Sequence, residues 1–246
     1  MKVIREELDS QAFGRNVLRL DEPEAGPGFA EFEAEYLAAW DPVYVYVKIP
    51  AEDLALSHHF EDQGFRFMEF QLRMSRRLPR RAFDTSAFDG VLEMRILGPG
   101  DDLEPVLNLA DEIFTNDRIY LDPLLPDKSL AKRRYRLYIA KSWLAEDEEV
   151  LAFHDRRDGR LVSFHTSKYL GGRLVLTLLG GHAPAHQGSG LGRGCTLNYF
   201  NHWISKGIVR VHTHISLANY RGLESEYKGD DYKPEQSFAV LRKIYP

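Results

Sequence analysis

The sequence of 246 residues contains a single cysteine, Cys195, and no long apolar run. One cysteine cannot form a disulfide within the chain, a usage typical of cytoplasmic proteins. Without an apolar run of about 18 residues, or an apolar segment behind a basic N-terminus, we expect neither a membrane span nor a secretory signal. The sequence therefore predicts a cytoplasmic protein in which Cys195 is a buried small apolar residue and not a nucleophile.

The chain also lacks an excess of positive charge: it has 32 lysines and arginines against 37 acidic residues, so its formal net charge is −5. A nucleic-acid-binding protein usually needs a basic surface, so we expect no nucleic-acid partner. The basic runs at 76–81 and 132–136 are interpreted as part of a linker and as a helix face. The chain has no Gly-x-Ser-x-Gly sequence and no set of ligands at a metal-binding spacing, which predicts neither hydrolase chemistry nor a metal site.

The apolar pattern divides the chain into two units joined by a linker. The first unit, 1–78, alternates predicted strands and helices, with strands at 16–20, 43–49 and 65–74 and helices at 28–40 and 51–64. Residues 79–90 are predicted to be the linker, because they are polar and are broken by Pro79 and Gly90. The second unit, 91–246, completes a mixed α/β protein.

In the second unit, helices and strands follow in a recognisable order. The pattern predicts strands at 91–97, 149–155, 160–167, 173–181 and 208–215, and helices at 98–114, 127–145 and 191–206. Turn signals separate the three strands between 149 and 181, which predicts an antiparallel meander.

A glycine-rich turn lies between the last of these meander strands and the helix at 191–206. Backbone N–H groups at a helix start, together with the helix dipole, favour an anion at such a turn. A phosphate loop of the Walker A type requires Gly-Lys-Ser/Thr, whereas here Gly192 is followed by Arg193. A dinucleotide-binding G-x-G-x-x-G that starts at Gly188 also fails, because Arg193 occupies the third glycine position.

The segment Gln187-Gly188-Ser189-Gly190-Leu191-Gly192 matches Q/R-x-x-G-x-G/A in full. It resembles the acetyl-CoA signature of the GCN5-related N-acetyltransferases (GNAT), and its place after the meander follows the order of that family. The resemblance implies a GNAT fold, with a central, mostly antiparallel, splayed sheet behind a smaller half-GNAT-like N-terminal domain. It further implies that acetyl-CoA is the co-substrate and that backbone N–H groups from Gln187 to Arg193 hold its pyrophosphate.

The same resemblance implies further contacts with the cofactor. In this family the strand before the turn splays from its neighbour and pairs with the pantetheine arm, which here points to Leu178, Leu179 and Gly180. Asn219 and Tyr227 match an asparagine and a tyrosine of the family, with one residue more between them than usual and with Gly222 in place of an alanine. The family uses the tyrosine as the general acid for the leaving thiolate. If the register differs, Tyr220 or Tyr232 takes that role.

Three longer segments, 8–20, 45–74 and 116–143, resemble the TDP-fucosamine acetyltransferase branch of the family. That branch acetylates the 4-amino group of a dTDP-4-amino-4,6-dideoxyhexose, so the implied acceptor is a nucleotide-linked amino sugar. Glu69 aligns with a glutamate proposed as the base there. Histidines are the alternative bases: His212 and His214 share one face of a strand, and His182 and His186 lie just before the glycine turn.

Two other functions stay open at this point. The chain could acetylate another amine, such as an aminoglycoside, a polyamine or a protein N-terminus. It could also be a non-catalytic module that binds acyl-CoA. The sequence leaves open whether the protein is a homodimer.

Overall fold

Ten strands form one sheet in the computed structural model, which describes residues 1–246 apart from the side chain of Lys228. Across the sheet the strand order is β1-β2-β3-β10-β4-β9-β8-β7-β6-β5. Neighbouring strands are antiparallel except for the pairs β2–β3 and β8–β9. The strands are β1 Lys2–Arg5, β2 Asn16–Asp21, β3 Pro42–Pro50, β4 Arg66–Arg77, β5 Leu92–Leu97, β6 Glu148–Asp155, β7 Leu161–Gly171, β8 Leu174–His182, β9 Arg210–Ser216 and β10 Lys233–Ile244.

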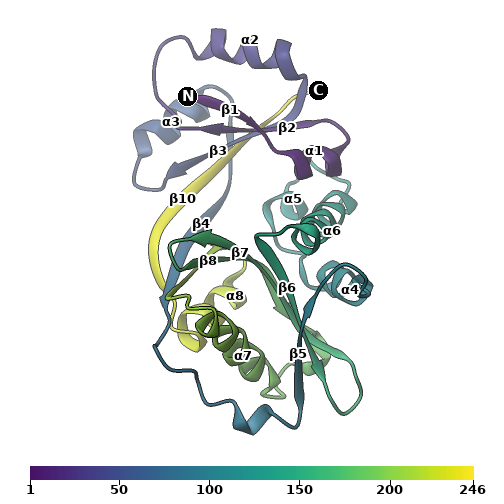
Figure 1. Ribbon diagram of the computed structural model, residues 1–246. Coiled ribbons are helices and arrows are strands. Elements are labelled where there is room, and N and C mark those ends of the chain that lie inside the picture. The colour runs from purple at the N-terminus through teal and green to yellow at the C-terminus, as the bar shows by residue number, and fades with distance from the viewer.

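Helices cover both faces of this sheet (Figure 1). Short 3-10 helices lie at Ser86–Phe88 and Pro184–His186, and a π-helix follows α8 at Ser225–Gly229. The α-helices are α1 Glu7–Phe13, α2 Phe29–Trp40, α3 Leu54–Asp62, α4 Glu104–Ile113, α5 Arg118–Leu121, α6 Ser129–Leu144, α7 Leu191–Ser205 and α8 Tyr220–Glu224.

In the N-terminal part, β3 is covered on both faces. Val47 and Ile49 pack with Phe60 of α3 in one cluster, whereas Tyr44 and Tyr46 belong to a second cluster that contains residues of α5 and α6. Successive side chains of a strand point to opposite faces, so a strand that is buried on both sides has an almost continuous apolar sequence. This explains why the segment Val43–Ile49 gives a strong strand signal.

In the C-terminal part, α4 and α6 cover one face of the sheet and α7 covers the other. Val150 and Ala152 of β6 pack against Ile139 of α6, and the intervening Leu151 packs in the cluster of α7, which also contains Cys195. The buried position of Cys195 agrees with its predicted role as a small apolar residue, and burial raises the pKa of its thiol to about 12.

The last strand, β10, connects the two parts of the sheet. It runs antiparallel between β3 and β4, with Val240 opposite both Lys48 and Glu69, and appears as the long yellow strand of Figure 1. Its Arg242 donates two hydrogen bonds of 2.7 Å to the carboxylate of Asp122, beside α5, and both side chains are buried. This ion pair joins the C-terminal strand to the helical face of the second unit.

The predicted mixed fold with a mostly antiparallel sheet is confirmed, including the antiparallel meander β6–β7–β8. The segment 79–90 lies against α7, because Asn201 accepts a hydrogen bond of 2.7 Å from Phe83 N and donates one of 2.9 Å to Phe83 O. The division into units at 78 and 91 remains a prediction. Over the part of the chain that the structure describes, no helix is long and apolar enough to cross a membrane.

We predict that Asp122→Ala lowers the free energy of unfolding by about 3–5 kcal/mol, because it leaves the Arg242 guanidinium buried without its counter-charge. Chemical denaturation followed by circular dichroism measures the change. Asp62→Ala, at an exposed carboxylate on α3, is the control and should shift the value by no more than about 0.5 kcal/mol. Equal effects of the two substitutions would contradict the prediction.

Candidate functional site

The glycine turn between β8 and α7 has the backbone geometry of an anion site. Gly188 and Gly190 have φ values of 76° and 80°, in the left-handed region that favours glycine, and Gly190 is the N-cap of α7. Ser189 Oγ accepts a hydrogen bond of 3.3 Å from Leu191 N and donates one of 2.6 Å to the His186 carbonyl. The N–H groups that follow Leu191 in the first helical turn have no acceptor within the helix, so they can bind a ligand.

Next to this turn, β8 and β9 separate. They pair only from Leu174 to Thr177 on β8, and the last rung joins Thr177 to Thr213. Beyond that rung the β7–β8 register shifts at Leu178, and Leu179 and Gly180 continue to pair with β7. The side of β8 that faces β9 therefore loses its strand partner at the residues predicted to contact a pantetheine arm.

A buried tyrosine supports the point of separation. The Tyr199 hydroxyl of α7 lies 2.8 Å from Ser167 Oγ and 2.5 Å from Thr177 Oγ1, and its ring stacks on His165 with 4.6 Å between centroids. Burial, followed by the neighbouring His182, lowers the pKa of His165 to about 3, so this imidazole is neutral. A Cβ at Gly180 would lie 2.6 Å from His165 Nδ1, which explains the glycine there. The sequence pattern did not single out Tyr199 or His165.

The segment after β9 explains two departures from the family pattern. Asn219 caps α8 by accepting a hydrogen bond of 3.2 Å from Gly222 N, and a Cβ at Gly222 would lie 2.5 Å from Asn219 Nδ2. An alanine at this position would disturb the cap. The additional residue between Asn219 and Tyr227 coincides with the π-helix Ser225–Gly229, whose wider turn holds one residue more than an α-helical turn.

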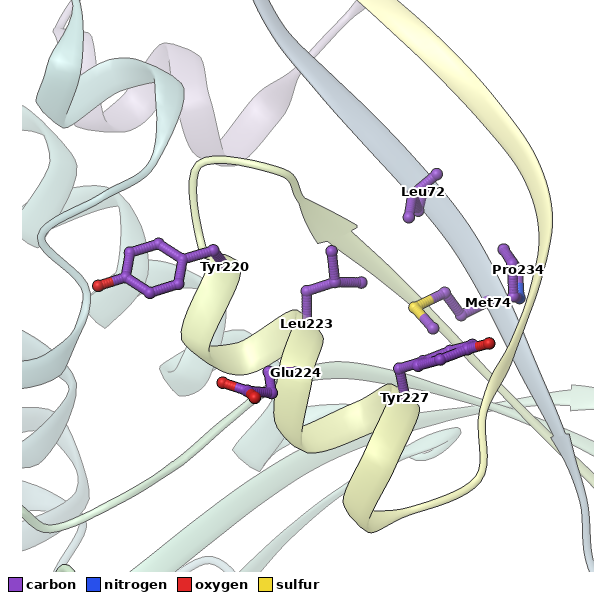
Figure 2. Close-up of a pocket in the computed structure, with 7 residues that line it drawn as sticks. All are labelled: Leu72, Met74, Tyr220, Leu223, Glu224, Tyr227 and Pro234. Atoms are coloured by element: carbon purple, nitrogen blue, oxygen red, sulfur yellow. The ribbon is translucent and has the colours of Figure 1, made fainter.

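The three tyrosines considered as general acid differ in exposure. Tyr232 is only 2% exposed and packs in the core cluster of α7, whereas Tyr220 and Tyr227 are 64% and 53% exposed. Tyr227 and Leu223 point toward β4 and β10, and the Tyr220 ring points away from these strands (Figure 2). Tyr220 and Tyr227 both line a cavity of about 430 Å³. Burial makes Tyr232 inaccessible to a cofactor in this conformation.

Glu69, the predicted base, lies on the other face of the sheet. Successive side chains of β4 alternate, so Glu69 faces away from Leu72 and Met74, which line the cavity beside Tyr227. Its buried carboxylate accepts a hydrogen bond of 2.7 Å from Gln71 and lies 3.6 Å from the Arg118 guanidinium. The predicted acid and the predicted base are thus on opposite sides of the sheet.

The face with Glu69 also carries unpaired positive charge. Lys48 of β3 makes no hydrogen bond or ion pair within the described part of the chain, and burial, followed by the Arg118 charge, lowers its pKa to about 8. His214 lies opposite Arg73 of β4, and burial with the charges of Lys48 and Arg73 lowers its pKa to about 4. Burial is the largest cause of both shifts, and the positive charges nearby add to it.

The remaining histidines do not form a metal site in the described residues, which contain no group of three or more side chains able to hold a metal ion. His212 lies on the same face as His214, with its Nε2 3.8 Å from Glu235. His182 is half-buried at the end of β8, and burial lowers its pKa. His186 belongs to the 3-10 helix before the glycine turn. After that turn, Arg193 of α7 donates a hydrogen bond of 3.1 Å to the Gly229 carbonyl.

Sequence reasoning also missed two partly buried carboxyl groups, Glu226 on the π-helix and Asp230 directly after it. Burial and the nearby Asp230 raise the pKa of Glu226 to about 8, and burial raises the pKa of Asp230 to about 6. Arg76 and Arg193 partly offset these shifts. Glu226 is therefore mostly protonated at neutral pH and adds little charge between α7 and the segment after α8. Nothing in the local sequence indicates this, because the shifts depend on burial in the folded chain.

No protein-family model matches this sequence, and no curated protein matches it significantly. Solved structures share its fold. A GCN5-related N-acetyltransferase from Sphaerobacter thermophilus has a TM-score of 0.62 at 14% identity, over 99% of this chain and 75% of that one. A tandem GNAT protein from the clavulanic acid biosynthesis pathway has a TM-score of 0.58 at 13% identity, over 94% and 76%.

A third similar structure is the glucosamine N-acetyltransferase region of a fungal multi-domain beta-N-acetylglucosaminidase. Its TM-score is 0.63 at 11% identity, over 98% of this chain and 31% of that protein. The chain therefore has the fold of the GCN5-related N-acetyltransferases. This confirms the fold expected from the resemblance, including the separation of the two central strands.

We predict that Tyr199→Phe lowers the free energy of unfolding by about 1–3 kcal/mol, because two buried hydroxyls then lose their partner. Tyr44→Phe is a matched control: the Tyr44 hydroxyl is also buried but has no hydrogen-bond partner in the described chain, so its removal should be neutral or stabilising. Urea denaturation of both variants measures the difference. If Tyr199→Phe is as stable as Tyr44→Phe, the hydroxyl network does not support the strands.

Proposed function

We propose that this protein is an N-acetyltransferase that moves an acetyl group from acetyl-CoA to an amine. The observation that carries the proposal is the glycine turn at the start of α7, placed directly beside the separation of β8 and β9. The turn offers N–H groups to a pyrophosphate, and the unpaired side of β8 offers backbone groups to a pantetheine arm. One feature without the other would not accommodate both parts of coenzyme A.

In this proposal the cofactor residues are those of the turn and the two elements beside it. Backbone N–H groups from Gln187 to Arg193 hold the pyrophosphate, the backbone of Leu178–Gly180 pairs with the arm, and Asn219 completes the site. Gly188 and Gly190 keep the turn open because a side chain at either φ would be strained.

The reaction is a direct transfer. The neutral amine attacks the thioester carbonyl, the N–C bond forms, and the C–S bond breaks as the tetrahedral intermediate collapses. Glu69 takes the proton from the amine, and the hydroxyl of Tyr227 donates a proton to the thiolate, whose basicity is close to that of a phenol. Their positions on opposite faces suit a substrate that reaches the thioester through the gap between β8 and β9.

The acceptor in this proposal is a nucleotide-linked amino sugar of the dTDP-4-amino-4,6-dideoxyhexose type. The ammonium group of Lys48, which has no ion-pair partner in the described part of the chain and lies on the face that carries Glu69, supports an acceptor with phosphate groups. The glucosamine acetyltransferase region among the similar structures acts, by its name, on an amino sugar and supports an acceptor of that class.

Thermal-shift measurements with acetyl-CoA and, separately, with dTDP test the proposal. Stabilisation by both ligands is the expected result. Stabilisation by acetyl-CoA alone would favour another amine as acceptor. Stabilisation by neither ligand would overturn the assignment as an acetyltransferase.

We predict that Gly190→Val weakens acetyl-CoA binding at least about ten-fold, because a β-branched residue does not adopt this φ and would close the approach to the N–H groups. Gly14→Val is the matched control: Gly14 has a φ of 68° at the end of α1, and an added Cβ has no neighbour within 4 Å at either glycine. Isothermal titration calorimetry should show a loss of acetyl-CoA affinity for Gly190→Val only. Equal affinities in two folded variants would remove the turn from the cofactor site.

We predict that Tyr227→Phe lowers the single-turnover rate about 10²–10⁴-fold with little change in acetyl-CoA affinity, because only the proton donor is removed. Tyr220→Phe and Tyr232→Phe are assayed in parallel. If only Tyr220→Phe lowers the single-turnover rate, Tyr220 is the general acid in place of Tyr227. Wild-type rates in Tyr227→Phe and Tyr220→Phe would mean that neither of these tyrosines acts as the acid.

A further inference from the structure

The cavity beside Tyr227 is larger than an acetyl group requires. It has a volume of about 430 Å³ and lies between α8 with its π-helix and the strands β4 and β10 (Figure 2). Apart from Glu224, its lining is apolar or aromatic: Leu72, Met74, Tyr220, Leu223, Tyr227 and Pro234. Apolar cavities of this size are typical of small-molecule sites.

Strand register places this cavity close to the separation of β8 and β9. Met74 of β4 lies opposite Thr213 of β9, and Thr213 pairs with Thr177 in the last rung before the strands separate. Neighbouring strands are about 4.8 Å apart, so Met74 and Thr177 are about 10 Å apart across the sheet. All three residues face the side of the sheet that α7 covers, because Met74 packs in the α7 cluster and Thr177 bonds to Tyr199.

The lining suits an apolar group better than a phosphate. None of the described side chains that line it is a lysine, arginine or histidine. A phosphate of coenzyme A, or of a nucleotide-linked acceptor, would lose hydration there without gaining a cation from these side chains, so it does not fit well. An uncharged apolar group does, because it gains free energy when it leaves water for such a lining.

The proposed donor and the proposed acceptor bind on opposite faces of the sheet. The cavity and the glycine turn lie on the face of α7 and α8, whereas Glu69, Lys48 and His214 lie on the opposite face. An acceptor whose amine meets Glu69 approaches from that opposite face. A group that enters the cavity belongs to the ligand bound on the face of the glycine turn, which is the acyl donor.

We propose that this cavity binds the acyl chain of a donor longer than acetyl-CoA, so that the protein transfers acyl groups of medium length. The inference rests on the proposed function for the coenzyme A site and extends it to the acyl group. Each methylene buried in an apolar lining contributes about 0.8 kcal/mol, or roughly four-fold in affinity. Affinity should therefore rise with chain length until the cavity is full, and then fall.

The experiment is calorimetry of the 246-residue protein with acetyl-, butyryl-, hexanoyl- and octanoyl-CoA. We expect affinity to increase by up to about four-fold for each added methylene until the cavity is full, and to fall for longer chains. Leu72→Phe, which reduces the cavity, should move the preferred chain to a shorter length, and Leu72→Ala should move it to a longer one. A general loss of structure would not move the preferred chain length in opposite directions in the two Leu72 variants. Phe70→Ala, two residues earlier on β4 and outside the lining, is the matched control.

The outcomes separate this inference from the proposed function. If acetyl-CoA binds but affinity is the same for all four thioesters, the inference is wrong and the proposed function stands. If Leu72→Phe and Leu72→Ala shift the preference in the same direction, or Phe70→Ala shifts it equally, the chain does not occupy this cavity. If an apolar amine competes with octanoyl-CoA at the cavity, the occupant is the acceptor. If no thioester binds, both proposals fail.

Discussion

The position of β10 between β3 and β4 is the constraint on which the rest of the architecture depends. The last strand of the chain pairs with two strands from the first third of the sequence, so neither part of the sheet is complete before the chain ends. The Arg242–Asp122 ion pair ties this strand to the face covered by α5 and α6. Buried charges of opposite sign require each other, because each would otherwise lack compensation for its lost hydration.

This arrangement also positions the candidate site. Because β10 lies between β3 and β4, β4 becomes the neighbour of β9, and its alternating side chains supply opposite faces. Leu72 and Met74 line the cavity under α8, and Glu69 joins Arg118 on the other side. The separation of β8 from β9 then opens the sheet between these two faces. A single strand thus contributes to both faces, which are the proposed donor side and the proposed acceptor side.

Much of the fold could be predicted because its signals are local. Left-handed glycines, helix periodicity and turn residues act over a few positions, so the glycine turn, α7 and the meander were recognisable in the sequence. The segment Lys233–Ile244 was not recognised as a strand. It begins with polar residues and contains Pro234, and its pairing partners lie more than 150 positions earlier, so no local pattern indicates them.

The sequence by itself determined the candidate cofactor turn, because the φ angles of Gly188 and Gly190 depend on the residues themselves. It also determined the order of helices and strands around that turn. Only the tertiary structure decided which candidate tyrosines are exposed, that Glu69 lies on the face opposite the cavity, and that Tyr199 and His165 pack beside the point where the strands separate. Exposure, charge environment and the face to which a side chain points depend on which distant segments pack together, and periodicity along the chain carries no information about those contacts.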